Sequence, residues 1–290
     1  HRLIRRQRQM CIRDSVTEPG TYFYKIFNPV DVEVYSYGPI IMSDKGFLDA
    51  IKWSSRKNHR LGIYRIEVVR EGKIIKSQTF RIKPALLHVE FINATTGSIE
   101  RIADAFVEFY VKYPSGEIAM SLDIPKGFKM GVFCGDSKIA EFKVDPSVAY
   151  DANENKWRII WKVPKNAKLG DKYSFVIYAS AIVDRYGNSG PEGDVSSSDE
   201  LGAFKVTATT LKVNLFLSPL AGNTFKRTVE TESRFYATYP DGSFFTNEDL
   251  KSAKIIVYTI SGGKWYEISL SPNDYDPKSR LWLVKWRVPY

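Results

Sequence analysis

Hydrophobic and polar residues alternate in two matching stretches of the chain. Residues 157–164 and 282–289 lie 125 positions apart and share two tryptophans, a basic residue, a valine and a closing proline. Because successive side chains of a strand point to opposite faces, the pattern predicts two core-forming strands that end at Pro164 and Pro289. The predicted inward side chains are Trp157, Ile159, Trp161 and Val163, and then Trp282, Val284, Trp286 and Val288. The motif therefore predicts packing and carries no chemistry of its own.

Further matches predict that the chain is a tandem array. Residues 109–116 match residues 235–242, which are 126 positions later and share a Tyr-Pro-x-Gly turn, and Tyr150-Asp151 matches Tyr275-Asp276. At a spacing of 108, Trp53, Lys57-Asn58 and Leu61-Gly62 match Trp161, Lys165-Asn166 and Leu169-Gly170. We predict a first repeat at 16–83 that is short or incomplete, a complete middle repeat at 84–208, and a third repeat at 209–290 that stops before its last strands.

Strand and turn signals occur throughout these repeats. In the first repeat we expect a strand from Val30 to Pro39, another over 46–53, and a hairpin of 61–69 with 73–82 around Glu71-Gly72. In the middle repeat we expect a strand over 106–113, a hairpin of 130–133 with 139–144, and one long strand over 173–183. The turn at 184–188 is expected to lead into a floppy polar insertion over 189–200. The third repeat repeats the hairpin over 255–260 and 265–270.

Several short strands with regular turn signals predict an all-β fold of tandem immunoglobulin-like β-sandwiches. The repeats resemble the tandem immunoglobulin-like domains of archaeal and bacterial cell-surface proteins, and the turn Asp184-Arg185-Tyr186-Gly187-Asn188 is similar to a hairpin common in them. The first repeat resembles a macroglobulin-type (MG2-like) sandwich over Gly46-Phe47, residues 61–64 and Thr79-Phe80. The resemblance implies an extracellular or cell-surface protein that forms arrays.

The first fifteen residues have a different character. Residues 5–15 resemble a translated sequencing adapter, because Met-Cys-Ile-Arg-Asp-Ser at 10–15 can be encoded by the library end ATG TGT ATA AGA GAC AGN. We interpret 1–15 as an artefact attached to a metagenomic fragment. The alternative is a basic arm for nucleic acid or a membrane. Without the five arginines and one aspartate of this stretch, the net charge falls from +9 to +5.

Composition sets broad limits on the class of protein. The chain is 43% hydrophobic, and no apolar run reaches the roughly 18–20 residues that span a bilayer. Beyond residue 15, Cys134 is the remaining cysteine, and we expect a small buried apolar group rather than a nucleophile. The histidines there are His59 and His88, in different repeats and without zinc-ligand spacing. No nucleophile elbow or phosphate-binding loop is present, so we predict no catalytic, cofactor or metal site and no enzyme.

Two sets of charged residues allow a functional alternative. Loop carboxylates precede each double-tryptophan strand and could bind Ca²⁺, but turn-capping accounts for them better; they are Asp145, Asp151, Glu154, Asp274 and Asp276. Outward basic residues could bind acidic glycans, but a solvated sheet face is the favoured interpretation. These are Arg65, Arg81, Lys83, Arg158, Lys162, Lys285 and Arg287. The 14% aromatic content is interpreted as core packing, so Trp161→Ala is expected to unfold the middle repeat.

The sequence thus favours a non-enzymatic spacer or adhesive module of an extracellular protein. Its expected partners are a surface glycan or neighbouring copies of the repeat, without nucleic acid. The alternative is a set of accessory domains, carbohydrate-binding or linking, of a secreted hydrolase. A weaker alternative is a fragment of a macroglobulin-like protease trap.

Overall fold

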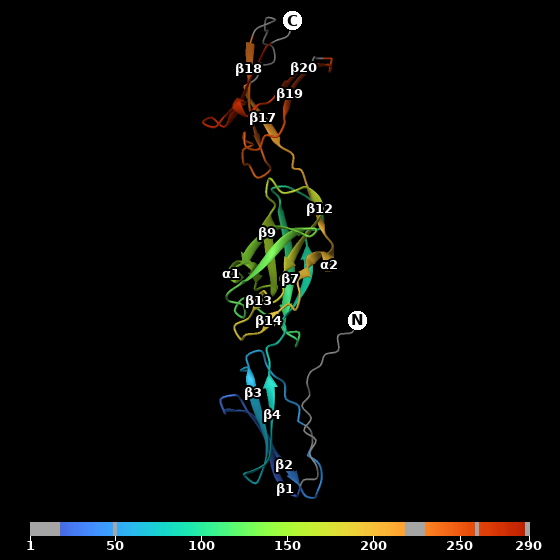
Figure 1. The fold of residues 1–290 in the computed structure, drawn as a ribbon, viewed down its shortest axis with the longest axis vertical. Coiled ribbons are helices and arrows are strands. Elements are labelled where there is room, and N and C mark those ends of the chain that lie inside the picture. Colours follow the sequence, from blue (N-terminus) through green and yellow to red (C-terminus); the bar gives the residue numbers. More distant parts are fainter. Residues whose placement is uncertain (1–17, 49–50, 218–229, 259–260, 288–290) are drawn as a thin grey trace. The chain divides into compact units, whose positions relative to one another are not determined.

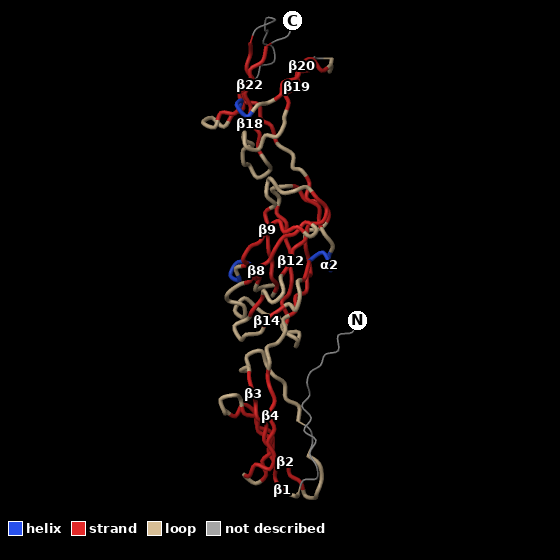
Figure 2. The backbone as a smooth tube through the Cα atoms, in the orientation of Figure 1, coloured by secondary structure: helices blue, strands red, loops and turns tan. Residues whose placement is uncertain are grey.

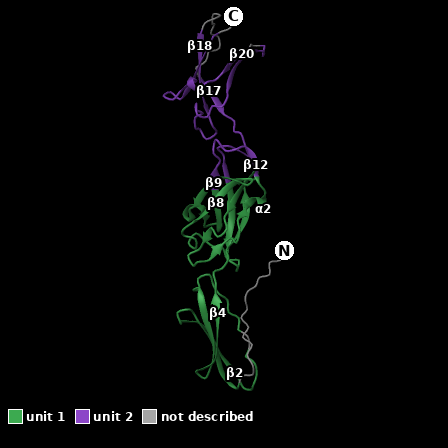
Figure 3. Ribbon diagram, in the orientation of Figure 1, with its two compact units in different colours: residues 1–96, 106–159, 172–203 green, residues 97–105, 160–171, 204–290 purple. Residues whose placement is uncertain are grey.

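A computed structural model describes residues 18–48, 51–217, 230–258 and 261–287. The adapter-like residues 1–15, Val288 and Pro289 therefore lie outside the described residues. By compactness the chain divides into two units (Figure 3): residues 1–96, 106–159 and 172–203 form one, and residues 97–105, 160–171 and 204–290 form the other. These limits differ from the repeat boundaries, and the division into three domains stays a prediction.

The first repeat is built on one antiparallel sheet (Figure 1). Its strands are β1 (Gly20–Phe27), β2 (Glu33–Met42), β3 (Gly62–Arg70) and β4 (Lys73–Ile82), in the order β2-β1-β3-β4. Alternate side chains of β1 and β3 are buried on one face, as a period of two requires. Leu48 and Ile51 come from the connection between β2 and β3 and pack against that face. The hydrophobic core of this repeat is thus closed by a loop.

Two expected strands of the first repeat differ from the structure. β2 does not end at Pro39 but runs to Met42, because β2 is an edge strand and Pro39 lies at a shift in its pairing register with β1. Between 46 and 53 the described residues form no strand. The predicted hairpin at Glu71-Gly72 is confirmed as β3 and β4.

The middle repeat is a sandwich of two sheets (Figures 1 and 2). One sheet has the order β10-β11-β7-β5, built from β5 (His88–Ala94), β7 (Asp104–Lys112), β10 (Tyr150–Asp151) and β11 (Lys156–Lys162). The other has the order β6-β16-β12-β8-β9, built from β6 (Gly97–Glu100), β8 (Phe128–Cys134), β9 (Ser137–Val144), β12 (Gly170–Ile177) and β16 (Phe204–Thr207). In chain order these are the ABED and GFCC′ sheets of an immunoglobulin fold, with β6 parallel to β16. The protein is all-β and immunoglobulin-like.

The predicted insertion at 189–200 is wrong, because that segment is folded. It holds β14 (Ser189–Gly190), which pairs with β13 (Ile182–Val183), then β15 (Val195–Ser196) and the short helix α2 (Ser197–Leu201). Ser197 is buried, and its hydroxyl accepts a hydrogen bond from the backbone N–H of Phe175 at 3.0 Å. The expected long strand 173–183 is correspondingly two strands, β12 and β13. The other short helix, α1 (Pro146–Ala149), follows β9.

The third repeat has the same strand order in its described part. One sheet runs β17-β18-β22-β21, from β17 (Lys212–Leu217), β18 (Glu230–Thr238), β21 (Tyr275–Asp276) and β22 (Leu281–Arg287). The predicted hairpin is present as β19 (Lys254–Tyr258) and β20 (Lys264–Ser269), and the 3-10 turn η1 (Pro272–Asp274) precedes β21. β17, β18 and β22 correspond to β5, β7 and β11. The sequence repeat is therefore a structural repeat.

The core tryptophans of these two repeats occupy equivalent places. Trp157 in β11 and Trp282 in β22 are fully buried. The Trp157 indole N–H donates to the carbonyl of Ala119 at 3.1 Å, and the Trp282 indole N–H donates to the carbonyl of Phe245 at 3.2 Å. The predicted inward faces of both strands are confirmed within the described residues, with Trp286 half-buried.

Candidate functional site

The loop carboxylates proposed as calcium ligands have structural partners. Asp145 caps α1 by accepting from the backbone and hydroxyl of Ser147, which lowers its pKa. Asp151 accepts from the backbone N–H groups of the following turn, and Glu154 pairs with Lys156. These contacts support the turn interpretation for this repeat.

The corresponding carboxylates of the third repeat behave in the same way. Asp274 forms a capping box with Ser271, and Asp276 accepts from the Ser279 hydroxyl and the backbone N–H of Lys278. The Ser279 bond is the main cause of the lowered pKa of Asp276. Within the described ranges, no group of three or more His, Cys, Asp or Glu side chains is placed to hold a metal ion.

Several of the outward basic residues are engaged in ion pairs. Arg65 contacts Asp31 at 2.8 Å and Glu67 at 2.7 Å, and Lys162 contacts Asp241 at 2.8 Å. Arg158 lies over the ring of Phe106. The remaining members, Arg81, Lys83, Lys285 and Arg287, are exposed. This arrangement favours a solvated, internally paired surface over a basic patch for an acidic ligand.

The histidines and Cys134 lie apart from one another. His59 stacks on Trp53 with ring centroids 5.1 Å apart, and its Nδ1 accepts from the backbone N–H of Arg56. Burial and the charge of Arg56 lower the pKa of His59. His88 is exposed at the start of β5, and Cys134 is half-buried at the end of β8, less buried than expected. None of the three contacts a partner suited to nucleophilic catalysis.

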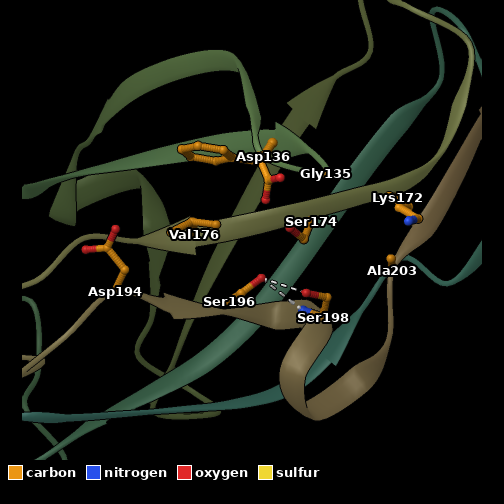
Figure 4. Close-up of a pocket in the computed structure, with 10 residues that line it drawn as sticks. Gly135, Asp136, Lys172, Ser174, Val176, Asp194, Ser196, Ser198 and Ala203 are labelled. Atoms are coloured by element: carbon orange, nitrogen blue, oxygen red, sulfur yellow. Dashed lines mark hydrogen bonds between the residues drawn. The ribbon is translucent and has the colours of Figure 1, made fainter.

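A surface hollow of about 540 Å³ lies on the middle repeat between β8, β12, β15 and α2 (Figure 4). Its lining combines an aromatic ring with polar and charged side chains. The lining residues are Phe133, Gly135, Asp136, Lys172, Ser174, Val176, Asp194, Ser196, Ser198 and Ala203. From the sequence, Gly135 and Asp136 lie only in the connection of the predicted hairpin of 130–133 with 139–144. The sequence pattern does not reveal the hollow, because its walls come from segments up to seventy residues apart.

The polar groups of the hollow are partly committed to the fold. The hydroxyls of Ser196 and Ser198 lie 2.8 Å apart, and Ser196 also accepts from the backbone N–H of Ser198 as the cap of α2 (Figure 4). Asp194 accepts from the backbone N–H of Ala179 at 2.7 Å. None of the lining residues is a histidine or a cysteine. The hollow offers hydrogen bonds and one aromatic wall to a polar ligand.

A buried polar network surrounds the turn at 184–188. The Tyr113 hydroxyl donates to Asp184 at 2.7 Å, and Asp184 also accepts from the backbone and side-chain N–H groups of Asn188. Burial and the bond to Asp184 strongly raise the pKa of Tyr113. Asn188 accepts from the backbone N–H of Ala85 at 2.7 Å and donates to the carbonyl of Lys57 at 3.3 Å. The network therefore connects the turn both to Lys57 of the first repeat and to Ala85, which lies just after that repeat.

No protein-family model matches the sequence, and no curated protein matches it. Solved structures do show a likeness. The chain is 11% identical to E. coli alpha-2-macroglobulin, with a TM-score of 0.28, over 93% of this chain and 16% of that one. For the surface layer protein SbsC, domains 4–9, the identity is 12%, the TM-score 0.24, and the coverage 84% and 32%. For titin domains I67–I69 the values are 12%, 0.29, 94% and 92%.

The chain thus spans less than a third of two of these proteins. At such scores the likenesses carry no inference about activity, and the immunoglobulin-like assignment stands on the strand order of the two sheets. None of the helices in the part of the chain that the structure describes has the length and apolar character needed to cross a membrane.

Proposed function

We propose that the chain is a non-enzymatic structural segment of an extracellular or cell-surface protein, in which tandem immunoglobulin-like repeats act as spacers. The observation that carries the proposal is the reuse of one packing element. Trp157 and Trp282 occupy the same register and make the same hydrogen bond in successive repeats. Repetition of a sandwich extends a chain without requiring a reactive site in any one copy.

The charged and nucleophilic side chains of the described residues support the same proposal. The carboxylates expected near the tryptophan strands cap turns, and three of the seven basic residues, Arg65, Arg158 and Lys162, form ion pairs within the fold. Perturbed titratable groups often mark catalytic sites, but structural networks perturb them as well. Here the strongly raised pKa belongs to Tyr113, whose hydroxyl bonds to a turn that links two repeats.

An experiment on intact cells tests the location. The full-length gene product, produced in a bacterial host, is treated with a membrane-impermeant amine reagent and digested for mass spectrometry. We expect exposed lysines such as Lys73 and Lys143 to be modified in intact cells. Modification only after lysis would contradict a surface location. A periplasmic marker protein and a cytoplasmic one calibrate the two compartments.

A second candidate function is glycan binding by an accessory domain, and the hollow in Figure 4 favours it. Phe133 provides an aromatic surface beside Asp136 and Ser174, a combination suited to a sugar ring and its hydroxyls. Binding of the purified chain to neutral and acidic polysaccharides tests this candidate. Saturable binding that is lost in Phe133→Ala and retained in Phe23→Ala would favour glycan recognition. Binding by neither form would leave the spacer role.

A further inference from the structure

A lysine of the first repeat is seated on a buried carboxylate of the middle repeat. The ammonium of Lys57 lies 3.0 Å from Asp123 and 2.7 Å from Glu117, and 5.3 Å from the centre of the Tyr113 ring. The Asp123 side chain is 5% exposed and the Lys57 side chain 19%. Asp123 also accepts from the backbone N–H of Met120, three residues earlier, at 3.2 Å. Both partners belong to the same compact unit.

The next pair of repeats uses the same contact. Lys165 of the middle repeat lies 2.7 Å from Asp249 of the third, whose side chain is 8% exposed. Asp249 accepts from the backbone N–H of Thr246, again three residues earlier, at 3.1 Å. Both residues belong to the second compact unit. Beside this pair, Lys162 contacts Asp241 at 2.8 Å.

The four residues occupy equivalent positions in their repeats. Lys57 and Lys165 each precede an asparagine and are separated by the spacing of 108 that also relates Trp53 to Trp161. Asp123 and Asp249 are separated by the spacing of 126 that relates the Tyr-Pro-x-Gly turns. Among the residues that the structure describes, the first repeat has one four-stranded sheet, whereas the middle repeat has the two sheets of a sandwich. Both repeats nevertheless have a Lys-Asn turn, Lys57-Asn58 and Lys165-Asn166, which we call the lysine turn. This indicates that the turn has a role other than packing in the core.

The burial of the two aspartates separates these contacts from ordinary surface pairs. An exposed ion pair contributes little, whereas a buried carboxylate without its partner is strongly unfavourable. Burial lowers the pKa of Lys57, but its bonds to Glu117 and Asp123 outweigh that effect and the pKa is raised. The bond to Asp249 likewise raises the pKa of Lys165. In each case the carboxylate stabilises the charged lysine.

We propose that Asp123 and Asp249 are a reiterated docking site for the lysine turn of the preceding repeat, so that successive repeats are joined by one interaction used twice. The partner that this surface accepts is an ammonium group carried on a Lys-Asn turn. The proposal rests on the proposed spacer function, and it names what the neighbouring copies recognise in one another.

Hydrogen bonds also fix the segment 85–87, which connects the first repeat to the middle repeat. We call this connection the first joint, and the connection of the middle repeat to the third repeat the second joint. The backbone N–H of Leu87 donates to the carbonyl of Ser189 at 2.9 Å, and that of Ser189 donates to Ala85 at 3.2 Å. Asn188 accepts from Ala85 on the same segment, and the backbone N–H of Arg185 donates to the carbonyl of Asp123 at 2.7 Å. The turn at 184–188 thus contacts both the segment 85–87 and the backbone of Asp123, the residue whose carboxylate binds Lys57.

Distances between spin labels in the full chain test the proposal. In a Cys11→Ser, Cys134→Ser background, labels at Ser77→Cys and Asn153→Cys report the first joint, and labels at Asn153→Cys and Ser252→Cys report the second. We expect Lys57→Met to widen the first distance distribution at least twofold and to leave the second unchanged. Lys165→Met is expected to widen the second distance distribution and to leave the first unchanged. Lys138→Met, which removes an exposed pair with Glu141 inside one hairpin, is the matched control and should change neither.

Each lysine variant changes one repeat and leaves the aspartate in the next repeat unchanged. A wider distance distribution therefore reports lost docking and not unfolding of the repeat that carries the aspartate. Asp123→Asn is expected to widen the first distribution in the same way, and its thermal unfolding reports any damage to the middle repeat. Unchanged widths in both Lys57→Met and Lys165→Met would overturn the proposal. This readout is independent of cellular location and of glycan binding, so the spacer proposal and the docking proposal can fail separately.

Discussion

Trp157 and Trp282 show how single residues determine the repeat. Each ring is buried, lies nearly parallel to a phenylalanine of the neighbouring strand and contacts a tyrosine seven residues earlier. Each indole N–H also donates a hydrogen bond to a backbone carbonyl, that of Ala119 for Trp157 and that of Phe245 for Trp282. One side chain therefore contributes both apolar area and a hydrogen bond, and its loss affects both.

Replacing Trp157 should destabilise the middle repeat strongly. Trp157→Ala removes a fully buried ring, and we expect a loss of about 3–5 kcal/mol in the free energy of unfolding. The matched control is Trp265→Ala, because Trp265 is 46% exposed on β20 and should cost less than about 0.5 kcal/mol. Denaturant unfolding followed by tryptophan fluorescence and circular dichroism measures both. Equal losses in the two variants would contradict the assignment of Trp157 to the core.

Gly127 provides a second test at the residue scale. It has a φ of +65°, and a Cβ there would lie 2.0 Å from the carbonyl oxygen of Val144. Gly135 has a similar φ of +57° but nothing within 4 Å of the corresponding Cβ. Both alanine variants meet the left-handed backbone cost of about 1–2 kcal/mol, so the comparison isolates the steric clash. We expect Gly127→Ala to lower the thermal midpoint clearly more than Gly135→Ala, and a reversed order would refute the clash.

At the scale of elements, alternation in the sequence identified the strands that have one buried face. For β11 and β22 the predicted inward faces agree with the structure, and the predicted hairpins are present as β3 with β4, β8 with β9 and β19 with β20. β6 was not found, because Gly-Ser-Ile-Glu carries a single apolar residue and its partner β16 lies more than a hundred residues later. The local pattern predicts a strand end at Pro39, because such a pattern does not show which strands lie at a sheet edge.

The polar segment 189–200 illustrates a further limit of local patterns. Its glycines and serines favour a loop by composition, yet its order comes from distant groups. Glu200 accepts from the backbone N–H of Phe91 at 2.8 Å, and Ser197 accepts from that of Phe175. The surface hollow beside this segment is likewise formed by residues that are far apart in the sequence. The contacts of Lys57 with Asp123 and of Lys165 with Asp249 also join distant residues. The lysine turns and the Tyr-Pro-x-Gly turns were visible as repeats, but which of them meet depends on tertiary structure.

Asn188 should hold the connection between the first two repeats. Asn188→Ala leaves the backbone N–H of Ala85 and the carbonyl of Lys57 without this partner, a loss of about 1–3 kcal/mol if the groups stay buried. We expect faster hydrogen–deuterium exchange in peptides that contain Ala85 and Leu87. Asn153→Ala, at an exposed turn, is the matched control and should leave exchange there unchanged. Unaltered exchange in Asn188→Ala would show that the turn does not hold the segment.

At the scale of the whole molecule, the contacts between the middle and third repeats, Lys162 with Asp241 and Lys165 with Asp249, should weaken at low pH. Bonds from Lys162 and Ser243 hold the pKa of Asp241 well below its usual value. Burial raises the pKa of Asp249, but bonds from Lys165 and Thr246 outweigh it, so that pKa is lowered as well. Carboxylates with depressed pKa values stabilise the folded contact above their unfolded pKa of about 3.9 and lose that contribution as the pH falls through the folded values.

We therefore expect the distance distribution between labels at 153 and 252 to stay narrow from pH 7 to pH 5 and to widen progressively as the pH falls below the unfolded pKa of about 3.9. The double variant Lys162→Met, Lys165→Met should be wide already at pH 7 and change little on acidification. A wild-type distribution that is insensitive to acid, while the chain remains folded by circular dichroism, would contradict a role for these carboxylates in the joint.

The parallel pairing of β6 with β16 has a mechanical consequence. The chain enters the middle repeat before β6 and leaves it after β16, and the two strands run in the same direction side by side. Tension that reaches the start of β6, beyond β5, and the end of β16 therefore pulls these strands lengthwise past each other and loads their hydrogen bonds in shear, all together rather than one after another. A stretched array of such repeats would resist extension until this short strand pair gives way, and then lengthen abruptly by one repeat at a time.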